Sequence, residues 1–126
     1  MLDDKELEKL CHGCTIKAKT YNSSETDATD EHFAIVIATN EQIAKGTRFR
    51  VVFISSNTSI DSTNVMPVPG ITGLKGFIIG SWAPFIEEAA ITEVRRVPLL
   101  APDMRKVLEL VRRADAAKKA KDTTQP

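Results

Sequence analysis

His32-Phe33-Ala34-Ile35-Val36-Ile37-Ala38-Thr39-Asn40 is the stretch of this sequence that decides the fold. Its six consecutive apolar residues, from Phe33 to Ala38, leave the segment without a polar face. Such a run is typical of a strand covered on both sides, near the middle of a sheet or in a small closed barrel. His32 opens this strand, and Asp30 and Glu31 precede it. The first functional question is therefore whether His32 does chemistry or only begins a strand.

Length and charge set the class of protein. With 126 residues, the chain is expected to form one domain, 1–126, with a real core. The formal net charge is zero, but residues 1–31 carry eight acids against four bases and residues 101–126 carry seven bases against four acids. Any nucleic-acid binding must therefore come from a local patch.

The sequence also bears on location. No apolar run approaches the roughly 20 residues that a membrane-spanning helix needs. The N-terminal residues are acidic and lack the apolar region of a signal peptide. We therefore expect a cytoplasmic protein that does not bind a membrane.

The rest of the chain alternates between short apolar segments and polar loops. Residues 2–11 have helical spacing, and a polar loop is expected over 21–30 before the central strand. Pro67 and Pro69 restrict their strand to an edge or a bulge. The other strands are expected at 15–19, 48–56, 64–69, 77–83 and 91–97, and a helix at 102–114 is followed by a flexible tail over 116–126. This order predicts a mainly β fold, a strongly bent sheet or β-barrel with an N-terminal and a C-terminal helix.

The apolar positions of these segments predict the core. Barrel positions are Ile16, Ile35, Ile37, Val52, Ile54 and Ile79, and the C-terminal helix is expected to pack on them through Met104, Val107, Leu108 and Val111.

The two cysteines, in Cys11-His12-Gly13-Cys14, have three interpretations: metal ligands, a redox pair or small half-buried thiols. Structural zinc needs about four ligands, and the chain has no second cysteine pair. The motif closes a predicted helix and opens a strand, the reverse of a thioredoxin-like unit. We therefore expect two small half-buried thiols at a helix-to-strand junction, and neither a metal nor a cofactor.

The order of parts over residues 12–114 resembles the PemK/MazF family of toxin–antitoxin ribonucleases. The family's "G-x-I/V" strand is similar to Gly13-Cys14-Thr15-Ile16, and its "R-P-x-V-V-I/L-S" strand is similar to residues 32–38. Its "P-I-T/S-S" segment is similar to Phe53-Ile54-Ser55-Ser56, and its later "G-L-x-x-x-S" to Gly73-Leu74 followed by Ser81-Trp82. The resemblance implies an SH3-like barrel, a homodimer, an RNA substrate and a small antitoxin partner.

The resemblance also implies roles for single residues. The family's Arg-Pro pair corresponds here to His32-Phe33, so a histidine replaces the catalytic arginine. Cleavage by the family uses the RNA 2′-OH as nucleophile, which requires a base, an acid and a cation. His32 would serve as base or acid, Arg48 or Arg50 would supply the charge, and Ser55 and Ser56 would hydrogen-bond the phosphate. Catalysis would then be metal-independent.

Further residues have two interpretations each. Lys17, Lys19, Arg48 and Arg50 would form one basic face that holds phosphates, or an ordinary solvated face. Trp82 would stack on a base or belong to the core.

Three functions therefore compete. The chain would be a sequence-selective endoribonuclease toxin that cleaves single-stranded RNA, a catalytically inactive relative that binds RNA or protein, or a generic SH3-like interaction module.

Overall fold

The computed structural model describes residues 5, 10–21, 29–46, 48–56, 63–95 and 98–124. The helix predicted over 2–11 falls almost wholly outside this part, although Leu10 and Cys11, at its predicted end, are described and are not helical. Most of the loop predicted over 21–30 also lies outside it.

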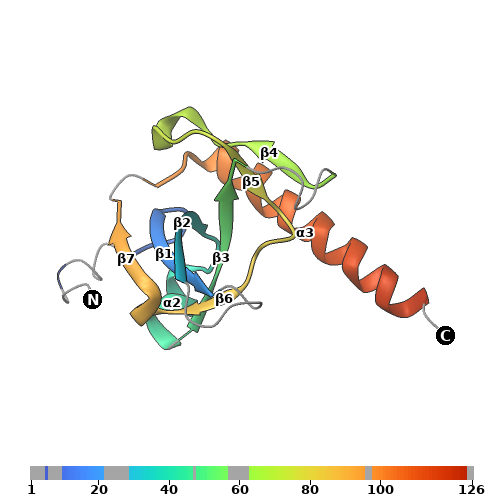
Figure 1. The fold of residues 1–126 in the computed structure, drawn as a ribbon, viewed down its shortest axis with the longest axis horizontal. Helices are drawn as coiled ribbons and strands as arrows, with labels where there is room; N and C mark the ends of the chain where they lie inside the picture. The colour runs from blue at the N-terminus through green and yellow to red at the C-terminus, as the bar shows by residue number, and fades with distance from the viewer. Residues whose placement is uncertain are drawn as a thin grey trace.

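The described chain forms seven strands and one long helix (Figure 1). The strands are β1 (Thr15–Tyr21), β2 (Thr29–Val36), β3 (Arg48–Ser55), β4 (Val65–Pro67), β5 (Phe77–Ile79), β6 (Phe85–Glu87) and β7 (Ile91–Val94). The helices are α2 (Asn40–Lys45) and α3 (Ala101–Thr124), with short 3-10 turns η2 (Gly70–Thr72) and η3 (Glu88–Ala90).

All strand pairs are antiparallel, and the sheet order is β4-β5-β3-β2-β1-β7, with β6 also paired to β3. The predicted mainly β fold with a C-terminal helix is confirmed. The sheet bends without closing, so its edges are β4 and β7 and the closed barrel is not formed. Strand β4 lies at an edge of the sheet. Pro67 has no N–H to donate, and at an edge this costs no ladder hydrogen bond.

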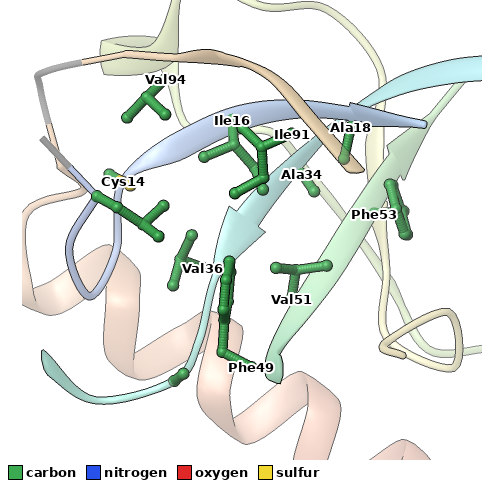
Figure 2. Close-up of a cluster of buried hydrophobic side chains, with 12 residues drawn as sticks. Cys14, Ile16, Ala18, Ala34, Val36, Phe49, Val51, Phe53, Ile91 and Val94 are labelled. Carbon is green, nitrogen blue, oxygen red and sulfur yellow. The ribbon is translucent and has the colours of Figure 1, made fainter. Parts of the chain in front are cut away.

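One core lies on one face of the sheet. Figure 2 shows its side chains converging from β1, β2, β3 and β7. Alternation along β3 places Phe49, Val51 and Phe53 on this face, where they are almost fully buried. The predicted core residue Ile16 belongs to it and is fully buried.

Helix α3 covers the opposite face, where Ile35, Val52 and Ile54 of the predicted core are buried. The buried side of the helix differs by one position from the prediction: Leu110 is buried, whereas Leu108 is 38% exposed. The helix also continues to Thr124, beyond the predicted end at residue 114. Ile37 is only half-buried. The flexibility of residues 116–126 stays a prediction.

Gly80 brings this helix and the sheet into contact. A Cβ at position 80 would lie 2.9 Å from Leu110 Cγ and 3.1 Å from the carbonyl oxygens of Asn64 and Leu110. Any larger residue would therefore push α3 away from the end of β5. The bend predicted at Gly80 is a turn over Gly80 and Ser81, which leads directly to Trp82.

Candidate nucleic-acid interface

An aromatic group lies where β2, β3 and the 82–84 segment meet. The His32 ring lies 5.0 Å from the Trp82 ring and 6.3 Å from the Phe53 ring, both edge-on, and Phe53 and Trp82 are 4.7 Å apart. The main chain fixes this segment against β3, because Phe53 N donates to Trp82 O at 2.9 Å and Val51 N donates to Pro84 O at 3.1 Å. His32 is half-buried and pairs with Ala18 inside β2, which begins at Thr29. The expectation that His32 opens this strand is therefore wrong, because the strand begins three residues earlier.

A cavity of about 570 Å³ opens beside this aromatic group. Phe53 and Trp82 form part of its wall, and Lys19 and Arg48 line it as exposed cations. Phe85, from β6, also lines it and is 58% exposed. Aromatic rings beside cations are the combination that binds single-stranded nucleic acid, since bases stack on the rings and phosphates bind the cations.

Arg50 lies in a neighbouring cavity of about 250 Å³, which Trp82 also lines. Arg50 and Phe53 are three positions apart on β3 and so point to opposite faces of the strand. The guanidinium donates through Nε to Ala83 O at 2.7 Å and through both terminal nitrogens to the Asp115 carboxylate at 2.7 Å. His32 therefore contacts the Trp82 ring, whereas Arg50 contacts the Ala83 carbonyl, and Trp82 lines both cavities.

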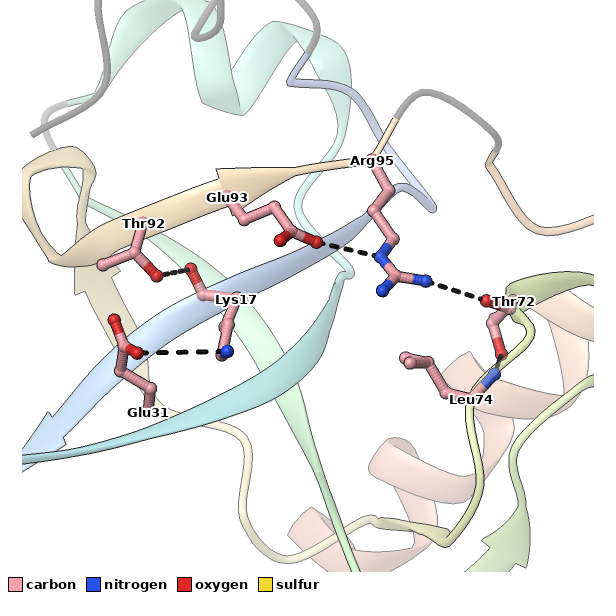
Figure 3. Close-up of polar contacts among 7 residues, drawn as sticks. All are labelled: Lys17, Glu31, Thr72, Leu74, Thr92, Glu93 and Arg95. Atoms are coloured by element: carbon pink, nitrogen blue, oxygen red, sulfur yellow. Dashed lines mark hydrogen bonds and ion pairs between the residues drawn. The ribbon is translucent and has the colours of Figure 1, made fainter.

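Lys17 lies in a different polar group, shown in Figure 3. Its ammonium is 4.0 Å from Glu31 and 5.4 Å from the centre of the Phe33 ring. Arg95 lies 4.8 Å from the same ring and also contacts Glu93 and the Thr72 carbonyl. The basic face predicted from four residues is therefore divided: Lys19 and Arg48 share the larger cavity, which Glu87 also lines, whereas Lys17 and Arg50 form ion pairs with Glu31 and Asp115.

Ser55 and Ser56 stand at the end of β3. Ser55 is half-buried, pairs with Phe77 of β5, and lies two residues beyond Phe53 on the same face of the strand. Ser56 is exposed. Their contact with a phosphate stays a prediction.

The cysteines lie away from both cavities. Cys14 is fully buried in the core around Ile16, and burial raises the pKa of its thiol to about 12, with Cys11 as a neighbour. Cys14 is therefore a thiol and not a thiolate at neutral pH, and a thiol is a poor nucleophile. Among the described residues, no cluster of His, Cys, Asp and Glu has the size needed to hold a metal ion. No helix in that part of the chain is long and apolar enough to cross a membrane.

The Arg50–Asp115 pair predicts an acid-dependent loss of stability. Hydrogen bonds from Arg50 hold the pKa of Asp115 below its ordinary value of 3.8. A carboxylate with a lowered pKa stabilises the fold above the unfolded-state value, and this contribution is lost as the pH falls through the lowered value. Because the Asp115 side chain is 48% exposed, we expect only about 0.5–1 kcal/mol. Urea unfolding at pH 6 and pH 2.5 should show a larger acid loss for the wild type than for Asp115→Asn; equal losses would contradict this assignment.

Comparisons with known proteins bear on the fold. No protein-family model matches the sequence, and no curated protein matches it. Solved structures do match. An endoribonuclease in complex with its cognate antitoxin, from a mycobacterial species, superposes with a TM-score of 0.65 at 7% identity, over 86% of this chain and 94% of that one. A chain of the MazE–MazF complex from Deinococcus radiodurans superposes with a TM-score of 0.66 at 9% identity, over 81% of this chain and 91% of that one.

The chain has the MazF fold. The predicted PemK/MazF-like fold is thereby confirmed, from a sequence with less than a tenth of its residues identical to these neighbours. Within this fold, sequence reasoning missed Phe85 and Asp115. Pro84 before a short apolar pair was a weak signal for β6 and Phe85. Asp115 gave no signal, because its partner lies 65 positions away.

Proposed function

We propose that this chain is the toxin of a toxin–antitoxin pair, a metal-independent endoribonuclease that cleaves single-stranded RNA in the cytoplasm. The observation that carries the proposal is the cavity beside Trp82 in a MazF fold, because it combines exposed Lys19 and Arg48 with aromatic rings. The mycobacterial neighbour with this fold is itself an endoribonuclease bound to an antitoxin.

The proposed reaction assigns each group one task. A base would stack on Phe85 or Trp82, and Lys19 and Arg48 would hold the flanking phosphates. The RNA 2′-oxygen attacks the adjacent phosphorus, the bond to the 5′-oxygen breaks, and the products carry a 2′,3′-cyclic phosphate and a 5′-hydroxyl. His32 would take the proton from the 2′-hydroxyl or give one to the 5′-oxygen, and solvent water would transfer the proton at the other oxygen. Arg50 would offset the developing charge, and Ser55 and Ser56 would hydrogen-bond the phosphate.

The proposal includes an antitoxin and a second copy of the chain as partners. A groove of about 650 Å³ between α2, β3 and α3 has Phe49 and Leu108 in its wall and Lys45 and Arg112 at its rim. An antitoxin segment with acidic and apolar side chains would be complementary to such a surface. The homodimer rests on the resemblance to the family.

The test is cleavage of RNA by the purified protein. We expect wild-type protein, incubated with varied single-stranded RNAs and a chelator, to give discrete fragments with a 2′,3′-cyclic phosphate end. Induced expression in bacteria should stop growth. Intact RNA across all substrates, together with normal growth, would contradict the enzymatic function. RNA binding without cleavage would instead favour the inactive, RNA-binding relative.

A further inference from the structure

The guanidinium of Arg50 is held by two partners in this chain, the Ala83 carbonyl and the Asp115 carboxylate. Nε is anchored on the Ala83 carbonyl, so the two terminal nitrogens have a fixed direction. Both donate to the two oxygens of Asp115, each at 2.7 Å. This paired geometry is the one in which arginine also binds a phosphate. A carboxylate of α3 therefore occupies the place where a phosphate would bind.

The occupied place adjoins the proposed RNA cavity. The cavity around Arg50 is lined by Trp82, Asp115 and Lys118, and Trp82 also forms the wall of the larger cavity with Lys19 and Arg48. A strand of RNA that stacks on Trp82 would therefore place a neighbouring phosphate close to Arg50. Lys118 adds a second cation on the same side.

Asp115 stands where α3 stops packing on the sheet. Val111 and Ala114 are buried, whereas all described side chains from Asp115 to Lys119 are exposed. In Figure 1 the C-terminal part of α3 projects beyond the strands. The two charged side chains are 29% and 48% exposed, and ion pairs with this exposure contribute little to stability. An anion of matching shape can therefore replace the carboxylate without unpacking the helix.

We propose that Asp115 is an internal competitor of the substrate, which occupies the Arg50 fork until a phosphodiester of single-stranded RNA displaces it. This inference rests on the proposed function and adds a regulation to its site. Asp115 keeps the Arg50 guanidinium in the orientation that binds phosphate. It also lowers the affinity of Arg50 for every anion that offers only one oxygen. A phosphodiester regains both hydrogen bonds and also gains the Trp82 surface.

The test uses an oligonucleotide that binds but cannot be cleaved. A fluorescently labelled 2′-O-methyl RNA lacks the nucleophile, so its anisotropy reports binding alone. Trp82 is the only tryptophan of the chain, and its own fluorescence reports whether the ligand reaches this place. Asp115→Asn should bind about three- to fivefold tighter than wild type at low salt. The slope of log affinity against log salt should steepen by about 0.7, the value for one more phosphate contact on a single strand.

Glu109→Gln is the matched control. It makes the same change of charge on the same helix, and it breaks an ion pair with Arg112 instead. We expect less than about a twofold effect from the general field alone. The gain from Asp115→Asn should also vanish when Arg50→Gln is present, as a double-mutant cycle would show.

Three outcomes would overturn the inference: equal gains from Asp115→Asn and Glu109→Gln, a gain that persists without Arg50, or no binding by wild type and Asp115→Asn alike. Binding with the expected gain, but no cleavage of unmodified RNA, would overturn the enzymatic function and leave the inference standing.

Discussion

Replacing His32 with alanine is expected to lower RNA cleavage by about 100- to 10,000-fold, the usual contribution of a general acid or base. The reason is its place 5.0 Å from the ring of Trp82, which lines the proposed RNA cavity. The measurement is the single-turnover rate of RNA cleavage, with binding of the 2′-O-methyl oligonucleotide as a separate readout. Binding should change far less than the rate.

Two further variants separate proton transfer from packing. His32→Phe keeps an aromatic ring against Phe53 and Trp82 but removes the titratable nitrogens, so it should be as inactive as His32→Ala. His12→Ala removes the other histidine of the chain, which hydrogen-bonds the Ala38 carbonyl in a turn, and should leave the rate unchanged. Full activity of His32→Phe would show that the ring only packs. His32→Arg restores the family's residue, and activity in that variant would show that positive charge suffices.

Replacing Val107 with aspartate is expected to destabilise the fold by at least about 3 kcal/mol, because it buries a charge without a partner. Val107 is fully buried, where α3 meets Ile35 and Val52. For a domain of this size the melting temperature should fall by roughly 10 °C or more. Thermal unfolding followed by circular dichroism measures it.

Leu108→Asp is the control, one position along the same helix. Leu108 is 38% exposed, so the same substitution should cost less than about 1 kcal/mol. Equal losses in the two variants would refute the observed orientation of α3. The two variants distinguish the predicted from the observed orientation of α3, because the sequence pattern alone placed both Val107 and Leu108 on the buried side.

The strands could be predicted from the sequence wherever a buried strand is a continuous run of apolar residues. The apolar run of β2 predicted a place near the middle of the sheet, and two prolines restricted β4 to an edge or a bulge; β2 is an inner strand and β4 is an edge strand. The helix orientation was harder, because residues 107, 108, 110 and 111 are all apolar. Two faces then fit the same spacing, and only contact with the sheet decides between them.

Helix α2 was missed for a different reason. None of its side chains is buried, so it has no apolar stripe for the period to reveal. Its capping box was visible, however: Thr39 Oγ1 accepts from Gln42 N, and Gln42 Oε1 accepts from Thr39 N. Strand β6 is only three residues long, which is too short for any period.

The candidate site was predictable residue by residue but not as an arrangement. Trp82, Lys19 and Arg48 were each singled out by type, and they share one cavity. That Arg50 and Phe53 point to opposite faces follows from alternation along β3, yet the partner of Arg50, Asp115, comes from an element 65 positions later. Pairing at that separation depends on how α3 crosses the sheet, which no local pattern specifies.

The order of strands has a consequence for synthesis on the ribosome. Strand β1 is made early, but one of its two neighbours, β7, is complete only when residue 94 has been added. The sheet face that carries Ile35 and Val52 is covered later still, when α3 has been made. Because such distant pairings form late, the nascent chain exposes apolar strands throughout most of its elongation. A chain cut short before residue 101 would lack the cover of this face altogether, and is therefore expected to aggregate or to occupy chaperones.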